Sequence, residues 1–414
     1  MRARLSIVLA LLLALGFPLR AQAPAPYTLD QAVALAQEQS PQVRAAREAL
    51  RAAEAQLAAA RAALQPSVGV GISGGLGPSG GSAQVNLGVS YLLYDGGLRQ
   101  AQIRQLEARV QSARENLAAL QAQVALSAVQ AYMNAVLADQ VVALRQQVVA
   151  QARTQLEGAQ ARVRAGTAPQ ADVVSAQAQL ASAEVSLLEA QANAQVSRAQ
   201  LASLLGLDPG APIAVVAPGV PPPFELSEEE VRSRALQRPE VRKAQAEVAA
   251  AEAALVVAQL QGGTTVSLDG RYGLLTVGTP GGAGTWSIGA SVSVPLYDGG
   301  QRSAAVEAAR ANLEAARATL EQARLEAQRE AVQAWLAWQS ALAREEAARR
   351  AQEAAQEALR VAEGRYAAGV GSLLEVAQAR AQLASVQESL AQATATRWTA
   401  LASLRRAVGM RVLP

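Results

Sequence analysis

The sequence predicts an α+β membrane protein built from four β-strands and several long α-helices, arranged as an internal two-fold repeat. Three observations lead to this fold class. A residue pattern recurs 203 positions later, four segments alternate in polarity, and two helical stretches are exceptionally long. Recurrence at a fixed offset over this distance indicates duplication, which sets the architecture before any single motif is considered.

The duplication is clearest at a glycine-containing motif that each half carries once. The segment Leu93–Gly97 reads LYDGG, and the same five residues stand at Leu296–Gly300. The same offset pairs Gly166 with Gly369, far from this motif. Because the offset is kept over this distance, the two halves are expected to have one shared architecture.

The predicted organisation begins with a secretory signal at residues 1–23, which combines arginines, an apolar run and a small-residue cleavage site. The first repeat follows at 24–205 and the second at 227–414. A linker at 206–226 joins them, since its many prolines exclude a helix or a central strand.

Composition narrows the function. The chain has 37 basic and 34 acidic residues, and the three arginines of the signal account for the whole excess. A neutral mature chain argues against a nucleic-acid partner, whose phosphates require a basic surface. The chain also lacks histidine and cysteine, which are common metal ligands and catalytic groups. We therefore expect no enzymatic activity, no metal site and no cofactor.

Short helices open each half. Asp30 is expected to cap the first of them, and Pro41 opens a second. In the other half Ser227 and Glu230 form a capping box, and Pro239 opens the matching helix 198 positions after Pro41. The change of offset from 198 to 203 falls between the paired strands, so the second hairpin loop is longer.

Four segments alternate between apolar residues and small or polar residues, with the period of two that is typical of strands. They form two predicted hairpins, at 66–94 and 264–295, each with a glycine-rich loop. Each segment has roughly the 9–11 residues that cross a bilayer when tilted. A soluble sheet with one wet face gives the same alternation. The strand length, the small residues on the polar face and the export signal favour a membrane barrel.

Each strand hairpin leads into a predicted helical hairpin, at 98–205 and at 299–408. The first begins with a stretch that contains no proline and one glycine, which predicts a single helix roughly 100 Å long. Its apolar residues follow a heptad spacing, and alanines in the seam allow close helix approach. The return helix (170–205) and the earlier helix (42–64) together nearly match the long helix in length. We expect them to stack end to end beside it.

Four strands from one chain leave two open edges, which lipid does not tolerate. Transmembrane barrels need about eight strands or more. Two copies would supply eight strands, and three copies would supply twelve with room for a pore. The sequence therefore predicts an oligomer.

With these features the chain resembles the TolC family of outer-membrane efflux proteins, over about Tyr27 to Gly409. The resemblance rests on the two-fold repeat and on LYDGG after each second strand. It also rests on Arg365–Gly369 (RYAAG) at the second helical turn, whose first copy is Arg162–Gly166 (RVRAG). It implies a homotrimer with a 12-stranded transmembrane β-barrel, four strands per chain, in outer-membrane lipid. This barrel would be continuous with a long α-helical barrel in the periplasm.

The resemblance also implies a function. Family members are passive exit ducts that receive substrates from an inner-membrane transporter through a periplasmic adaptor (membrane fusion) protein, in tripartite efflux or type I secretion. The alternative is a structural coiled-coil spacer or tether of the envelope without a conducting pore. That alternative explains the export signal and the heptads, but not four bilayer-length strands.

The resemblance places the two helical turns at the periplasmic tip. It assigns Asp172 and Glu375 to a gate that favours cations. The helix macrodipole is the alternative reason for an acid near each helix N-terminus. The adaptor is expected to contact six residues at the turns: Ala165, Gly166, Thr167, Ala368, Gly369 and Val370.

Some relatives hold the tip closed with a basic residue between the turn glycine and the acid, and this chain has none there. A polar lock would have to use other side chains near the turns, namely Arg162, Arg164, Arg365 and Tyr366. On the polar face of one strand, Asp269 and Arg271 would either line the lumen or pair with each other.

Overall fold

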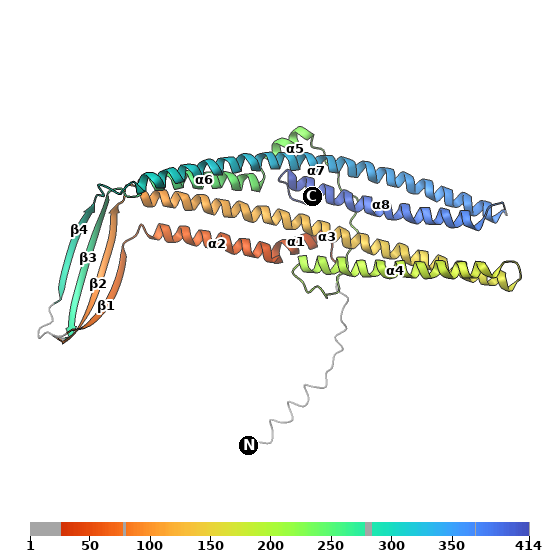
Figure 1. Ribbon diagram of the computed structural model, residues 1–414, viewed down its shortest axis with the longest axis horizontal. Helices are drawn as coiled ribbons and strands as arrows, with labels where there is room; N and C mark the ends of the chain where they lie inside the picture. The colour runs from red at the N-terminus through yellow and green to blue at the C-terminus, as the bar shows by residue number, and fades with distance from the viewer. Residues whose placement is uncertain (1–25, 78–79, 278–283, 369, 414) are drawn as a thin grey trace, which may run out of the picture.

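The computed structural model describes residues 26–77, 80–277, 284–368 and 370–413. The predicted signal at 1–23 and the turn residue Gly369 lie outside the described residues. Figure 1 shows an elongated molecule, with the strands at one end and the two helical turns at the other.

The first-half elements are α1 (Leu29–Gln39), α2 (Pro41–Ala62), β1 (Ser67–Gly77), β2 (Gly80–Tyr94), α3 (Leu98–Arg164) and α4 (Gln170–Leu204). The second-half elements are α5 (Glu228–Ala235), α6 (Pro239–Leu260), β3 (Thr265–Val277), β4 (Thr285–Ser293), α7 (Gln301–Ala367) and α8 (Leu373–Ala407).

The four strands form one antiparallel sheet in the order β1-β2-β3-β4, so the pairing of β2 with β3 joins the two halves. Both hairpins have the same register. Val68 faces Val89 in the first hairpin, and Val266 faces Val292 in the second, at the offsets of 198 and 203 that the sequence shows. The predicted fold class, long helices with four antiparallel strands, is confirmed.

Each long helix begins directly after an LYDGG motif. Gly97 precedes α3 with a φ of 88°, and Gly300 precedes α7 with a φ of 89°, in the left-handed region that favours glycine. The Asp95 carboxylate accepts hydrogen bonds from the backbone N–H groups of Gly97 and Arg99, each at 3.0 Å, and from Arg99 Nε at 2.7 Å. The aspartate therefore caps the helix that the two glycines allow to turn away from the strand.

The long helices are continuous, whereas their neighbours are broken. α3 and α7 have 67 residues each, and α4 and α8 have 35 each. At the end of α4, a Cβ on Gly206 would lie 3.2 Å from the carbonyl oxygen of Gln39, just before α2. At the end of α8 the approach is looser: a Cβ on Gly409 would lie 3.8 Å from Arg238 Cα and 4.0 Å from the carbonyl oxygen of Gln237, just before α6. Each return helix therefore meets a short helix at a joint beside a continuous one, as Figure 1 shows.

Two apolar cores surround these joints. The first gathers α1, α3 and α4 around Tyr132 and Leu201, and the second gathers α5, α7 and α8 around Trp338 and Leu404. The Leu201 and Leu404 side chains, which are repeat equivalents, are fully buried. The duplication thus provides one core for each joint.

Tyr132 of the first core forms hydrogen bonds with the linker at 206–226. Its hydroxyl lies 2.7 Å from the carbonyl oxygen of Tyr27 and 2.6 Å from that of Val216, and it accepts a hydrogen bond from Val216 N–H at 3.1 Å. Tyr27 also forms a parallel bridge with Val215. The start of the first half and the linker are thereby held on α3.

The expectation that Asp30 caps the first helix is wrong. Thr28 Oγ1 accepts a hydrogen bond from the backbone N–H of Gln31 at 3.3 Å, and the Gln31 side chain accepts one from Thr28 N–H at 3.1 Å. This reciprocal pair is a capping box, which satisfies two backbone donors at once. Asp30 lies in the first turn, where a negative charge is favourable.

In the described part of the chain, no helix combines the length and the apolar character needed to cross a membrane.

Candidate functional site at the helical tips

The first tip is the turn between α3 and α4. Gly166 has a φ of 73°, and its N–H donates to the Val163 carbonyl at 3.0 Å. Thr167 N–H donates to the Arg162 carbonyl at 2.9 Å, and Thr167 Oγ1 donates to the same oxygen at 3.1 Å. Together these bonds form a Schellman motif, which ends a helix by placing glycine in the left-handed region.

The second tip, between α7 and α8, also has backbone bonds that end its helix. The N–H groups of Val370 and Gly371 both donate to the Arg365 carbonyl at 3.0 Å. Gly371 packs so closely that a Cβ would lie 3.0 Å from Arg365 Cβ and from the backbone nitrogen of Tyr366. Ser372 Oγ then accepts a hydrogen bond from Glu375 N–H at 3.2 Å and caps α8. The tight turn therefore fixes where α8 begins.

The two candidate gate acids occupy equivalent positions. Asp172 lies in the first turn of α4 and Glu375 in the first turn of α8, and both side chains are exposed. Glu375 Oε2 lies 3.9 Å from Arg365 Nε, a distance at which a surface pair contributes little free energy. Both acids are therefore available to solvent at the end of the molecule.

Two of the candidate lock residues meet across the tips. Arg162 Nη1 donates a hydrogen bond to Tyr366 Oη at 3.3 Å, which connects the end of α3 with the end of α7. Arg162 and Arg164 each also donate through Nε to the carbonyl four residues back in α3, at 3.3 Å. Arg162 is thus the arginine of the first tip that bridges to the second tip.

The sequence analysis missed a contact just behind the second turn. Arg380 Nη2 on α8 donates to Glu363 Oε1 on α7 at 2.7 Å. The position of the turn provided the signal, because Glu363 lies four residues before the end of α7 and Arg380 lies seven residues after the start of α8. Both residues therefore stand within about two helical turns of the tip. The first tip has instead a small apolar cluster of Ala159, Val173 and Ala176.

Asp269 and Arg271 lie on β3, where they face different neighbours. Asp269 Oδ2 accepts a hydrogen bond from Ser267 Oγ at 3.2 Å. Arg271 lines a polar hollow of about 620 Å³ on the sheet, together with small residues such as Gly69, Gly88 and Ser287. Within the described ranges no ion pair joins Asp269 and Arg271.

Comparison with known proteins identifies relatives over most of the chain. A family model described as outer membrane efflux protein matches residues 32–207 and 231–410. Nodulation protein T of Rhizobium leguminosarum bv. trifolii is 26% identical over 226 residues, which cover 53% of this chain and 48% of that protein. Protein CyaE of Bordetella pertussis is 35% identical over 135 residues, which cover 30% of this chain and 28% of that protein. The chain thus spans less than half the length of either relative.

Solved structures extend the likeness to the whole fold. The outer membrane channel CmeC of Campylobacter jejuni has a TM-score of 0.81 at 20% identity, with 92% of this chain and 85% of that chain covered. At this identity the likeness concerns the fold alone: a four-stranded sheet continued by long helices.

Proposed function

Because the chain belongs to the outer membrane efflux protein family, we propose that it is the outer-membrane exit duct of a tripartite efflux or type I secretion system. It lies in the outer membrane and extends into the periplasm. There it conducts substrates passively from an inner-membrane transporter and a periplasmic adaptor protein. The observation that carries the proposal is a sheet with two open edges that continues directly into helices of 67 residues.

The outer face of the sheet supports insertion into lipid. The side chains of Val70 and Ile72 on β1 are 66% and 80% exposed, and those of Trp286 and Ile288 on β4 are 74% and 71% exposed. Burying a large apolar side chain contributes about 1.5–3 kcal/mol, so leaving this face in water would be costly. Lipid on this face removes that cost.

A homotrimer supports conduction. Among the described residues, the edge strands β1 and β4 have backbone groups with no partner strand, and a membrane requires that such groups be paired. Three copies close a barrel of twelve strands around a pore, in which Asp269 and Arg271 face the lumen. An envelope spacer without a pore would need neither the open edges nor the apolar face.

The tips form the periplasmic gate and the adaptor contact in this proposal. Val370 is 69% exposed, and Ala165, Gly166, Thr167 and Ala368 are exposed as well. Leu374 and Val174 beside the turns are 66% and 58% exposed, and exposed apolar side chains gathered at one end of a molecule are typical of a protein contact. Asp172 and Glu375 would then supply six carboxylates around one aperture.

Neutralising the gate acids is expected to weaken cation preference. In the variant Asp172→Asn with Glu375→Gln, the aperture loses its negative potential. The cation-to-anion permeability ratio is then expected to fall by about threefold, which corresponds to a loss of roughly one kT. Reversal potentials of single channels in planar bilayers under a salt gradient measure this ratio.

The control is Glu228→Gln with Glu229→Gln, which removes the same charge from the first turn of α5, far from the tips. An unchanged ratio in the tip variant would refute the gate assignment while leaving the duct intact. Absence of stepwise conductance from wild-type protein reconstituted as an oligomer would instead favour the spacer.

Breaking the contact between the tips is expected to open the gate. Arg162→Gln removes the hydrogen bond to Tyr366, and a bond to a charged group is worth about 1.5 kcal/mol. The open probability is therefore expected to rise about tenfold where the closed state dominates. Single-channel recording measures it.

Arg164→Gln is the matched control, because both arginines donate through Nε to the carbonyl four residues back, and only Arg162 reaches the other tip. Tyr366→Phe should reproduce Arg162→Gln, and combining the two should add nothing. Equal effects of Arg162→Gln and Arg164→Gln would contradict a specific lock.

A further inference from the structure

Arg271 on β3 is exposed and lies at a hollow of about 620 Å³ on the polar face of the sheet. Gly88 of β2 faces it on one side, and Ser287 of β4 faces it on the other. Asn86 and Thr285 line the hollow in the next row, toward the end of the sheet away from the helices. Among the described residues of this lining, Arg271 has the one charged side chain, and amide, hydroxyl and backbone groups surround it.

Three glycines keep the hollow open beside the arginine, namely Gly69, Gly71 and Gly88. Their backbone conformation does not require glycine, since none of them has a positive φ. Packing does not require it either. A Cβ on Gly69 or Gly71 would meet nothing within 4 Å, and one on Gly88 would lie 3.9 Å from the Gly69 carbonyl oxygen. Glycine weakens the interior of a strand and often marks the close approach of a ligand, so the open space itself needs a reason.

The sequence gives Arg271 a single acidic neighbour on the strands. Asp269 is the one acid in the segments 67–94 and 264–297. It lies two residues before Arg271 on the same face, about 7 Å along the strand. Its Oδ2 accepts the hydrogen bond from Ser267 Oγ, on the side away from Arg271. Since no ion pair joins the two residues in the described part of the sheet, the guanidinium can pair with an anion from solution.

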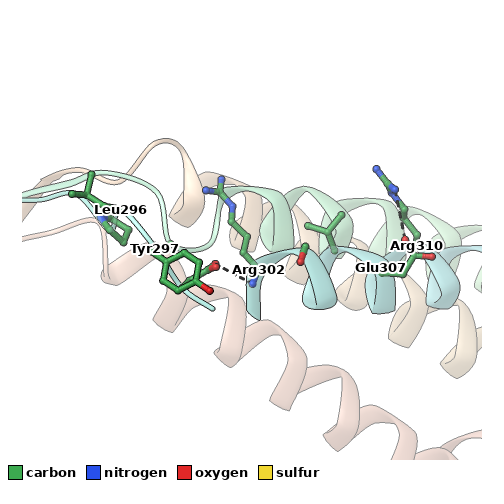
Figure 2. A pocket seen from close by; sticks show the side chains of 10 residues that line it. Leu296, Tyr297, Arg302, Glu307 and Arg310 are labelled. Atoms are coloured by element: carbon green, nitrogen blue, oxygen red, sulfur yellow. Dashed lines mark hydrogen bonds and ion pairs between the residues drawn. The ribbon is translucent and has the colours of Figure 1, made fainter. Parts of the chain in front are cut away.

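A hollow of the same volume at the second LYDGG turn differs in this respect. Figure 2 shows Leu296 and Tyr297 on the segment before α7, with Arg302, Glu307 and Arg310 following along the helix. Arg310 Nη1 lies 3.6 Å from Glu307 Oε2. Arg302 Nε donates to a backbone carbonyl at the end of α6 at 3.1 Å. Both arginines of that hollow thus have protein partners, and exposed apolar side chains form part of its wall.

We propose that the hollow around Arg271 binds the anionic group, a phosphate or a carboxylate, of solutes that leave through the duct. A guanidinium can donate two parallel hydrogen bonds to either group. The Asn86 amide and the hydroxyls of Thr285 and Ser287 supply further donors in the same lining. The site rests on the proposed function for its access to these solutes, because the polar face lines a lumen only in a closed barrel.

The site acts at contact distance and not through a long-range field. Asp269 balances the charge of Arg271 within about 7 Å, which is less than the Debye length of about 8 Å at physiological ionic strength. A distant ion therefore meets a nearly neutral stretch of wall. An anion that reaches the hollow meets the guanidinium itself. The site also lies at the opposite end of the molecule from the tips, as Figure 1 shows, so its effect can be measured separately from that of the tip acids.

Block of single-channel current by pyrophosphate tests the site. Pyrophosphate is added to both chambers of a planar bilayer that contains the purified oligomer, and the wild-type current is expected to fall as its concentration rises. Arg271→Gln should raise the half-blocking concentration about fivefold, as the loss of one exposed ion pair allows. Asp269→Asn is the matched control. It removes the opposite charge from the same face and should lower the half-blocking concentration instead.

Gly88→Thr tests the open space while leaving the charge unchanged. Gly88 faces Arg271 directly, and threonine is well accepted in strands. The new side chain fills part of the hollow, so the half-blocking concentration should rise about threefold. Gly289→Thr is its control, because Gly289 faces Asp269 and does not line the hollow, and a Cβ there would also meet nothing within 4 Å. It should behave like wild type.

Calorimetric titration of the same purified oligomers with pyrophosphate separates the site from the duct. Equal block and equal binding in wild type and Arg271→Gln would overturn the site while conduction keeps the duct. A Gly88→Thr channel that is blocked like wild type would also overturn it, because a charge without a built hollow would then explain the block. Binding that depends on Arg271 in a protein that does not conduct would keep the anion site and overturn the proposed function.

Discussion

Replacing Glu345 by glutamine is expected to lower the free energy of unfolding by about 3 kcal/mol, the cost typical of breaking a buried ion pair. The Glu345 side chain on α7 is 3% exposed. It accepts hydrogen bonds from Arg349 Nη2 at 2.6 Å and from Arg397 Nη1 on α8 at 2.8 Å. Arg397 also lies 5.6 Å from the Trp338 ring and donates to the Pro221 carbonyl at 3.2 Å. Without the carboxylate, the largely buried Arg397 loses its counter-charge.

Guanidinium unfolding followed by tryptophan fluorescence measures this effect, because Trp338 and Trp398 lie in or beside the network. Glu346→Gln is the matched control, since its side chain is the next acid along α7 and is exposed. Equal stability of the two variants would show that the buried pair contributes nothing beyond its exposed neighbour.

The same pair predicts a dependence on pH. Burial raises the pKa of Glu345, but hydrogen bonds from Arg397 and Arg349 and their charges outweigh burial and hold the pKa below its usual 4.5. Because the pKa of Glu345 is lower in the folded than in the unfolded state, its contribution to the free energy of unfolding is complete above the unfolded-state pKa. That contribution is lost as the pH falls through the folded-state pKa. The difference between wild type and Glu345→Gln should therefore shrink in acid below about pH 4.5. A difference that stays constant in acid would contradict this linkage.

Replacing Arg238 by methionine is expected to cost about 3 kcal/mol as well, and to loosen the joint between α6 and α8. The Arg238 side chain is 3% exposed and donates to Glu330 on α7 at 2.7 Å and to Glu240 at 3.0 Å. Arg406 at the end of α8 donates to the same Glu240 at 3.0 Å. Methionine would remove the ion-pair partner of Glu330 and leave Arg406 as the counter-charge of Glu240.

The first half of the chain supplies a built-in control for this prediction. Ser40 and Gln42 occupy the positions of Arg238 and Glu240, so the other joint forms without these charges. The double variant Arg238→Met with Glu330→Gln should therefore recover part of the lost stability, because it also removes the acid that Arg238→Met leaves without a partner. Chemical unfolding measured alongside Arg238→Met would show it. A double variant less stable than Arg238→Met would mean that the charges themselves, and not their pairing, hold the joint.

Much of the architecture could be predicted because it depends on local periodicity. The long helix α3 has no proline to interrupt its heptads, and the alternation of Val68, Val70 and Ile72 shows a strand with one apolar face. The broken helices could be predicted from lengths alone, because a helix rises by a constant amount per residue. The cap at Thr28 could not be separated from one at Asp30, since both residue types cap helices and only the position of Gln31 decides.

The contacts of the tips were partly predictable. Arg162 and Tyr366 stand four and three residues before the two turn glycines, so the repeat places them level with each other. Which of Arg162 and Arg164 faces the other tip depends on rotation about the helix axis. That rotation accumulates small errors over 67 residues. For the same reason no pattern in the sequence links Glu345 to Arg397, which lie 52 residues apart on two helices.

The joints beside α3 and α7 have a mechanical consequence. A bundle bends where its elements are interrupted, and here two of the four helices at the middle of each chain are interrupted at Gly206 and Gly409. On the tip side of these glycines α4 and α8 can swing with their turns, while on the sheet side α2 and α6 stay with the strands. Flexure is thereby concentrated at one level of the molecule. A partner that pulls on the tips could move them outward while the strand register at the far end stays unchanged.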